Sequence, residues 1–218
     1  SSIRPMSCAP KWLAEVALKM ARPSTLRRSA FSLIEAMMAI SIMAIAGGAI
    51  MLALTSATQT TQMSAESTIA MGIADRLIDE VVGKRYAAAG AGPYQTTLTA
   101  NSWELAGQGR ERFDDTDDYH GFIAQPVEGV GGLELGQGDE NGTLRPENFR
   151  LPSGYFSSWR EEIEVYYVGA TDQSIRLPTG STSDFRAVEV RIVRVNPDGS
   201  DTELANLRRV YAYVPSPQ

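Results

Sequence analysis

The chain has 218 residues, of which 43% are hydrophobic and 21% charged. This balance excludes a disordered chain and a polytopic membrane protein, and the length suffices for one domain with one extension. Residues 1–30 contain six basic residues and one acidic residue, leaving 14 basic and 25 acidic residues in 31–218, a formal net charge of −11. A body this acidic repels nucleic acid, so we expect no nucleic-acid partner.

Cysteine and histidine are nearly absent. Cys8 is the one cysteine and His120 the one histidine, so residues 31–218 can form no internal disulfide and little zinc or thiol chemistry. No nucleophile motif accompanies His120, and a single histidine beside aspartate is typical of a hydrogen-bonded structural residue. The sequence therefore predicts a protein that is not an enzyme.

An apolar run covers residues 31–54, with Glu35 as its only charge. As a helix it would be about 36 Å long, enough to cross a bilayer. Arg27 and Arg28 precede it, so the positive-inside rule predicts a cytoplasmic N-terminus and a body on the far side of the membrane. Three simpler interpretations remain at this point: a cleaved secretory signal ending near 46–57, an uncleaved signal anchor, and a buried helix of a soluble protein.

The string Arg-Arg-Ser-Ala-Phe-Ser-Leu-Ile-Glu at residues 27–35 favours a sharper interpretation. It resembles the prepilin peptidase signal of type IV pilins and type II secretion pseudopilins, in which a basic leader and a small residue precede Phe, and Glu follows four residues later. Ala30 stands where this family nearly always has glycine. The resemblance implies that prepilin peptidase removes the leader 1–30 by cutting between Ala30 and Phe31, and that the new amine of Phe31 is methylated. Leaders in the family are short, which suggests that translation starts at Met20.

The same resemblance gives Glu35 a role in assembly. A carboxylate and an amine in apolar surroundings are each costly alone and much cheaper as a pair. Glu35 is thus expected to neutralise the terminal amine of a neighbouring subunit and to set the register of docking. The implied partners are prepilin peptidase, the inner membrane, and other pilins or pseudopilins that contact the N-terminal helix. No cofactor is expected.

Helical periodicity continues through residues 55–89. Ile69, Ile73, Leu77 and Val81 follow one another at four-residue spacing and form an apolar stripe that needs a partner surface. Glycine and proline at residues 90–93 end the pattern, so we expect one helix from residue 31 to about residue 89. The glycine pair at 47–48 favours either close helix packing or local melting.

Residues 90–218 change to short apolar segments separated by turns, which predicts a globular head. Residues 162–168, 187–195 and 209–214 read as strands, with a turn at 196–199 and loops at 129–148 and 170–184. Val188, Val190 and Ile192 should share one face. The expected fold is α+β and pilin-like, with the long N-terminal helix packed on an antiparallel sheet.

The most distinctive part of the head is an acidic segment containing Asp114, Asp115, Asp117 and Asp118. These carboxylates are candidate calcium ligands, although the spacing is not that of an EF-hand. We favour a solvated loop whose aspartates cap turns, without a metal. The pattern Asp-Asp-x-Asp-Asp-Tyr-x-Gly resembles a stretch in minor pilins related to the mannose-sensitive haemagglutinin pilus. A second acidic stretch, residues 139–142, reads as a polar turn.

The sequence thus predicts a minor pilin or pseudopilin, incorporated after processing into a type IV pilus or a type II secretion pseudopilus. Before assembly it would be a single-pass protein of the bacterial inner membrane with a periplasmic head. The alternative is a periplasmic binding protein that has an ordinary signal peptide or anchor and no relation to filaments.

Overall fold

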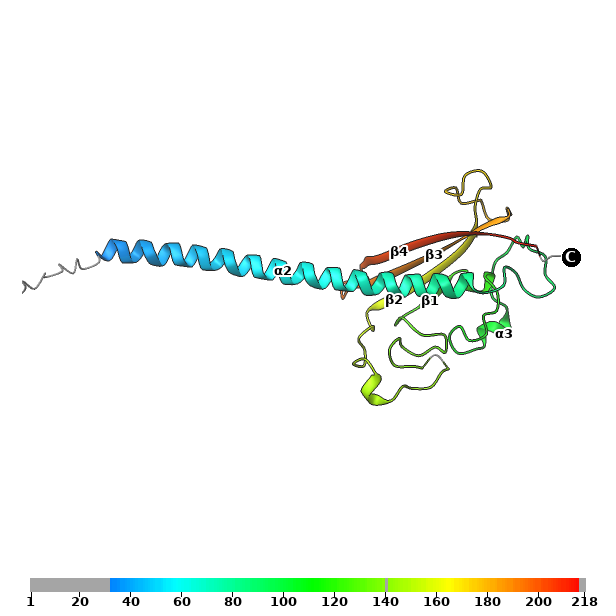
Figure 1. The fold of residues 1–218 in the computed structure, drawn as a ribbon, viewed down its shortest axis with the longest axis horizontal. Helices are drawn as coiled ribbons and strands as arrows, with labels where there is room; N and C mark the ends of the chain where they lie inside the picture. The colour runs from blue at the N-terminus through cyan, green and yellow to red at the C-terminus, as the bar shows by residue number, and fades with distance from the viewer. Residues whose placement is uncertain (1–31, 140, 216–218) are drawn as a thin grey trace, which may run out of the picture. The chain divides into compact units, whose positions relative to one another are not determined.

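The computed structural model describes residues 32–139 and 141–215, which form two compact units divided between Ser56 and Ala57 (Figure 1). The predicted cleavage site, Ala30 and Phe31, lies outside the described residues, as does the leader with Cys8. The elements in chain order are α2 Leu33–Val82, α3 Ser102–Leu105, the 3₁₀ helix η1 Asp117–Tyr119, β1 Phe122–Ala124, the 3₁₀ helix η2 Glu147–Phe149, β2 Trp159–Tyr167, β3 Phe185–Val195 and β4 Asp201–Ala212.

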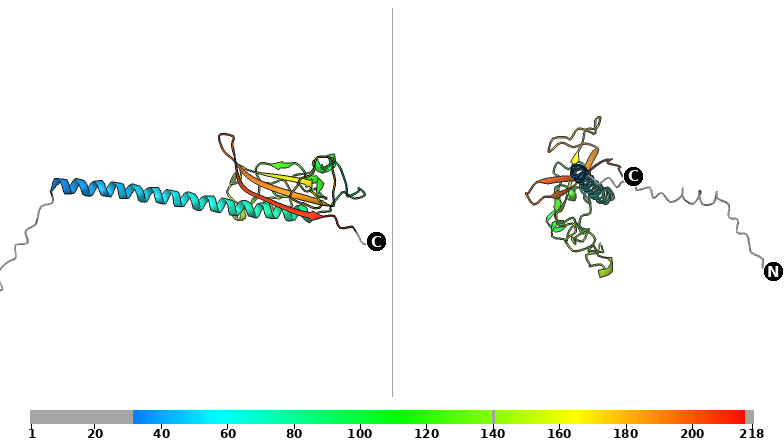
Figure 2. Two further views of the ribbon diagram at one scale, coloured as in Figure 1. Left: turned by 90° about the horizontal axis from the view of Figure 1, so that it is seen from above. Right: turned by 90° about the vertical axis from the view of Figure 1, so that its left-hand side faces the viewer.

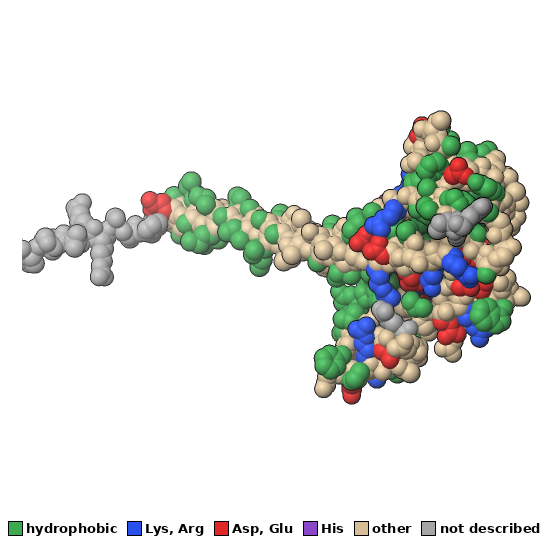
Figure 3. All heavy atoms as spheres, turned by 45° about the vertical axis from the view of Figure 1, so that its right-hand side comes forward, with side chains coloured by type: hydrophobic (Ala, Val, Ile, Leu, Met, Phe, Trp, Pro, Cys, Tyr) green, Lys and Arg blue, Asp and Glu red, His purple; other side chains and the backbone are tan. Residues whose placement is uncertain are grey.

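The first unit is the N-terminal part of α2. The helix continues without a break through the glycine pair at 47–48, and no residue from 33 to 56 is buried. Hydrophobic side chains cover this part of the helix in the space-filling view (Figure 3). Among the described residues, α2 is the one helix long and apolar enough to cross a membrane, and it lies near the N-terminus.

The second unit contains the rest of α2, from residue 57 to Val82. Its buried positions confirm the predicted stripe with one exception, because Ile69 is 37% exposed. From residue 70 on, buried positions recur every three or four residues, the spacing that keeps side chains on one face of a helix. The buried residues of the helix are Ala70, Ile73, Ala74, Leu77, Ile78 and Val81.

The helix ends at Val82, so the prediction of a helix reaching residue 89 is wrong. Gly83 still donates its N–H to the carbonyl of Asp79, at 3.0 Å, but the backbone then leaves the helical path. Arg85 instead forms a parallel bridge with Asp115, and its carbonyl accepts the N–H of Thr116 at 2.9 Å. A pairing thirty residues along the chain therefore replaces the last turns of the helix.

The four strands form one antiparallel sheet in the order β1-β2-β3-β4 (Figures 1 and 2). The three predicted strands are confirmed, and each begins earlier than expected, most of all β4. Strand β1 was missed, because three residues are too few for an alternating pattern to be recognised. The expected turn between β3 and β4 is present, with the N–H of Gly199 bonded to the carbonyl of Asn196 at 2.9 Å.

One face of the sheet and the buried stripe of α2 enclose the core. Val188, Val190 and Ile192 are fully buried together, as predicted. They pair with Val165, Ile163 and Glu161 of β2, so a charged residue occupies a core position in the register. The long helix and the antiparallel sheet make this an α+β protein.

Candidate functional site

Two parts of the chain hold the residues for which the sequence predicts a function. The first is the start of α2, where Ser32 and Glu35 form a reciprocal cap. The N–H and hydroxyl of Ser32 both donate to Oε2 of Glu35, at 2.9 and 3.0 Å, and the N–H of Glu35 lies 3.3 Å from the Ser32 hydroxyl. A serine followed three residues later by glutamate is the sequence pattern of this cap, and it satisfies donors that a helix start leaves free.

Both bonds from Ser32 reach the same carboxylate oxygen of Glu35. The other oxygen, Oε1, accepts no hydrogen bond from the described residues. Glu35 is also exposed, and hydrophobic side chains follow it along the helix. The carboxylate can therefore accept a donor from outside the chain without giving up its role at the helix start.

The acidic segment forms the second part, in the other unit. It lies beside the residues that follow α2. Lys84 donates to the carbonyl of Phe113 at 2.8 Å, and Thr116 donates through its hydroxyl to the carbonyl of Tyr86 at 2.9 Å. The segment closes with the 3₁₀ helix η1, whose Tyr119 is fully buried. Backbone pairing on one side and an aromatic anchor on the other hold the aspartates in place.

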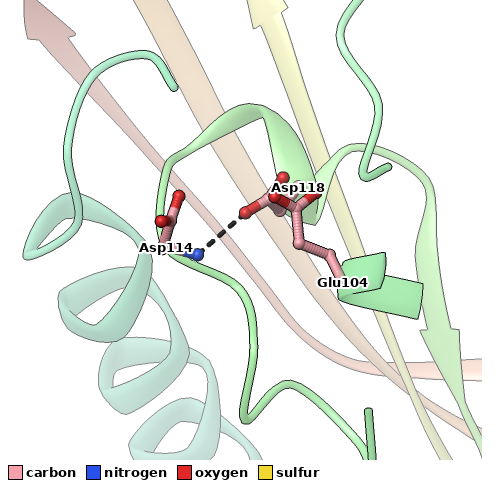
Figure 4. Close-up of side chains that lie close together, drawn as sticks. All are labelled: Glu104, Asp114 and Asp118. Atoms are coloured by element: carbon pink, nitrogen blue, oxygen red, sulfur yellow. Dashed lines mark hydrogen bonds between the residues drawn. The ribbon is translucent and has the colours of Figure 1, made fainter. Parts of the chain in front are cut away.

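Asp118 is the centre of a carboxylate cluster shown in Figure 4. Its Oδ2 accepts the N–H groups of Asp114 and Asp115, at 2.8 and 3.2 Å. Glu104, from α3, brings a third carboxylate, so that ligand oxygens of Glu104, Asp114 and Asp118 all lie within 4.8 Å of one another. Glu104 and Asp118 are buried, whereas Asp114 is exposed and pairs with Arg85.

The other two aspartates turn away from this cluster. Oδ1 of Asp115 accepts the N–H of Asp117 at 3.0 Å, and Oδ1 of Asp117 lies 3.4 Å from the buried guanidinium of Arg186. The ring of Tyr86 covers that guanidinium, with its centroid 4.2 Å away, in cation–π contact. The four aspartates therefore have separate surroundings and do not form one site.

Burial raises the pKa of Asp118 to about 7, and the neighbouring Glu104 carboxyl adds to the rise, although the two backbone N–H bonds act in the opposite direction. Burial also raises the pKa of Asp115 to about 7, with a further contribution from Asp117. A carboxyl group removed from water and placed beside another carboxyl is most stable when it is protonated.

The expectation of a solvated loop is thus wrong for three of the four aspartates. Asp115, Asp117 and Asp118 have exposures of 1%, 3% and 4%, and only Asp114 faces solvent. The expectation that they cap turns is confirmed for Asp115 and Asp118. Backbone donors, Arg186 and protonation make burial possible where charge alone would forbid it.

A cation would meet a different set of ligands from the one that the sequence suggested. Asp115 and Asp117 are not among the three carboxylates that converge, and Glu104 was not a candidate. Calcium takes about 6–8 oxygen ligands, and three carboxylates, one of them already bonded to two N–H groups, are a small part of that number.

A second buried charge cluster was not predicted. Arg110 is fully buried and donates from Nε to Glu80 of α2 at 3.0 Å and from Nη1 to Glu161 of β2 at 2.7 Å. Tyr119 donates its hydroxyl to the same Glu80 at 3.0 Å. Burial raises the pKa of Glu161 to about 7, and its Oε2 has no hydrogen-bond partner among the described residues.

One signal for this cluster is present in the sequence. Every second residue of β2 from 159 to 165 lies on its inward face, and Glu161 is the charged member of that set. A charged residue on an inward register position requires a buried partner. No spacing in the sequence identifies Arg110 as that partner, because 51 residues separate the two.

His120 does not follow its prediction. Its Nδ1 is buried and has no hydrogen-bond partner in the part of the chain that the structure describes, so the expected side-chain hydrogen bond at this atom is absent. The polar turn after residue 138 is confirmed, since Oδ1 of Asp139 accepts the N–H groups of Asn141 and Thr143, both at 3.0 Å.

Comparison of the chain with protein-family models, with curated proteins and with solved structures finds no match.

Proposed function

We infer that the chain is a minor pilin or pseudopilin, which is anchored in the bacterial inner membrane and joins a filament through α2. The observation that carries this proposal is the exposed apolar part of α2, which has one carboxylate and begins within the string 27–35 that resembles the prepilin signal. The pilin-like fold, the cut between Ala30 and Phe31 and the assembly role of Glu35 are parts of the same proposal.

The first support is the amount of apolar surface that α2 leaves uncovered. Residues such as Ile42, Ile45 and Leu52 are 64%, 74% and 75% exposed. Apolar side chains gathered at this density on a helix over 30 Å long belong in lipid or against other helices. A prepilin uses both surroundings in turn, the membrane before assembly and the helix bundle of the filament afterwards.

The second support is the state of Glu35. An ionised carboxylate within an apolar helix is costly and marks a functional position. Ser32 occupies one oxygen of the carboxylate and leaves Oε1 open. The cationic amine that cleavage would create on Phe31 of a neighbouring subunit is the partner that this position requires.

The third support is the distribution of charge. Arg27 and Arg28 stand before the apolar run, which favours a cytoplasmic N-terminus and therefore a periplasmic head. In a pilin-like arrangement the sheet covers the second part of the helix and leaves the first part free for assembly.

The test is N-terminal sequencing of the full chain extracted from membranes. The proposal requires a mature protein that begins at a methylated Phe31. A start beyond Ala46, or a chain that keeps its leader, would show the alternative of a periplasmic binding protein with an ordinary signal or anchor. Replacing Ala30 with Trp should leave the precursor uncut, because the peptidase accepts a small side chain before the cut.

Two substitutions separate the charge of Glu35 from its hydrogen bonds. Glu35→Gln keeps an acceptor for Ser32 and removes the charge, while Glu35→Ala removes both. Both variants should be cleaved and inserted normally but be largely missing from sheared filaments. If Glu35→Gln entered filaments as well as the wild type, pairing with a terminal amine would not be the function of this residue.

A further inference from the structure

The turn after residue 138 contains an asparagine that differs from the other four in the sequence. Asn141 is exposed and precedes Gly142, which has no side chain to shield its backbone nitrogen from the Asn141 amide. No side-chain hydrogen bond holds Asn141 among the described residues. Its amide group is therefore free to move toward the backbone that follows it.

Each of the other asparagines is protected in a different way. Asn101 caps α3 and accepts from Trp103 and Glu104. Asn196 donates to Ser200 and Thr202 and precedes a proline, which has no N–H. Asn206 lies within β4 and donates to Glu189 at 3.3 Å, and Asn148 lies in η2 before the bulky Phe149.

The backbone around Asn141 is held while its side chain is not. The N–H of Asp139 donates to the carbonyl of Thr143 at 2.9 Å, which closes the turn. Gly142 has φ +78°, a backbone conformation that residues other than glycine rarely adopt. Its N–H makes no hydrogen bond to the described residues, so the nitrogen that would react is not engaged elsewhere.

We propose that Asn141-Gly142 is a site of spontaneous deamidation in the folded head. The backbone nitrogen of Gly142 attacks the side-chain carbonyl carbon of Asn141 and forms a five-membered succinimide ring. The bond from that carbon to the amide nitrogen breaks, and ammonia leaves with the proton from Gly142. One water molecule then opens the ring and yields either aspartate or isoaspartate at this position, without an enzyme or an oxidant.

The product would alter the turn. Either product adds a carboxylate two residues from Asp139, which already accepts from the backbone. Isoaspartate also lengthens the main chain by one methylene where Gly142 packs closely on Gly131, as a Cβ placed on Gly131 would lie 2.7 Å from the Gly142 nitrogen. The fraction of molecules with a changed charge and backbone at this exposed loop would thus rise with the age of the protein.

The sequence Asn-Gly-Thr is also the acceptor pattern for N-linked glycans. The structure favours deamidation, because the Thr143 hydroxyl that the pattern requires donates to Asp139 and the turn is closed around it. A glycan on Asn141 would occupy the amide nitrogen that deamidation must release, so one measurement distinguishes the two.

The test uses the full chain in detergent, kept at mildly alkaline pH for days and then cleaved with trypsin. Because trypsin does not cut between Arg145 and Pro146, Asn141 falls in the peptide 113–150 together with Asn148, and fragment ions between the two residues assign a gain of one mass unit to Asn141. We expect Asn141 in this peptide to convert progressively while the other four asparagines stay unchanged. Asn141→Gln should abolish the gain and serves as the matched control, since it keeps the amide and lengthens the reach.

Either of two results of this experiment would overturn the proposal. One is a wild-type peptide that remains unchanged while the same chain, unfolded in urea, converts, because the fold would then protect Asn141. The other is conversion of the remaining asparagines at the same rate, which would remove any role of this turn. A glycan on Asn141 in protein from its native host would also contradict it.

Discussion

Helix α2 has two halves that belong to different surroundings. In the first half Ile45 is 74% exposed, and in the second half Leu77 is 1% exposed, although both are apolar residues of one helix. The carboxylates differ in the same way. Glu35 bonds within its own helix start, whereas Glu80 bonds to Arg110 and Tyr119 from the rest of the head.

The difference shows that the second half of α2 is stabilised by contacts within the chain, whereas the first half is not. In the second half, the sheet covers the apolar stripe and the buried Arg110 binds the carboxylate of Glu80. The first half offers the same kinds of group with nothing in the described residues to cover them. Substitutions in the second half should therefore change folding, and those in the first half should change only what happens between molecules.

The largest effect is expected for Arg110→Met. The substitution leaves the fully buried Glu161 and the partly buried Glu80 without their cation, and breaking a buried pair by removing one partner costs about 3–5 kcal/mol of unfolding free energy. Urea denaturation of the fragment 57–218 measures it. Arg112→Met is the control, because the partly exposed pair of Arg112 with Glu111 contributes at most about 1 kcal/mol. Equal losses in the two variants would mean that the buried cluster is unimportant.

Leu77→Ala and Ile45→Ala test the two halves directly. Loss of a fully buried leucine costs about 2–5 kcal/mol, depending on how far the cavity collapses. Ile45→Ala should leave the unfolding free energy of the head unchanged, and its effect should appear in the amount of protein recovered in filaments. A head destabilised by Ile45→Ala would contradict the division of the helix.

The acidic segment should make stability fall as pH rises. The pKa of Asp115 and that of Asp118 are raised to about 7, so the folded chain keeps protons that the unfolded chain loses above about pH 4. Unfolding free energy should decrease from about pH 4 to about pH 7 and level off above.

Asp118→Asn isolates one of these groups. It removes the titration but keeps an oxygen for the N–H groups of Asp114 and Asp115, so thermal melts should show a shallower pH slope. Asp114→Asn is the matched control on the exposed side of the cluster and should keep the wild-type slope. An unchanged slope in Asp118→Asn would show that Asp118 is ionised in the folded state.

The smallest effect is expected from calcium. Ionic screening of an acidic surface gives a small rise in melting temperature, similar for Ca²⁺ and Mg²⁺. A bound ion at a hundredfold excess over its Kd would add about 2.7 kcal/mol. A large rise that is specific to Ca²⁺ and lost in Glu104→Gln would show that the three converging carboxylates form a metal site.

Local pattern was enough to predict much of the fold. Spacing along α2 identified its buried face, and alternation identified three strands and the inward set of β3, because both follow from backbone geometry. The end of α2 was predicted seven residues too late. Helical propensity extends to residue 89, but pairing of residues 84–86 with residues 113–116 decides where the helix stops.

The acidic segment shows more clearly where prediction from local sequence pattern fails. Four aspartates in five residues indicate water or a cation when they are considered alone. Only the folded chain brings Arg186 to Asp117 and Glu104 to Asp118, from 69 and 14 residues away, and changes a solvated loop into a buried one.

The sequence by itself determined the apolar run, its single carboxylate, the amphipathic stripe and the alternating strands, since each depends on neighbours within a few residues. The tertiary structure decided the partners of the buried charges Arg110, Glu161 and Arg186. Their free energies depend on atoms that are distant in the sequence and on the exclusion of water around them, and no local pattern carries that information.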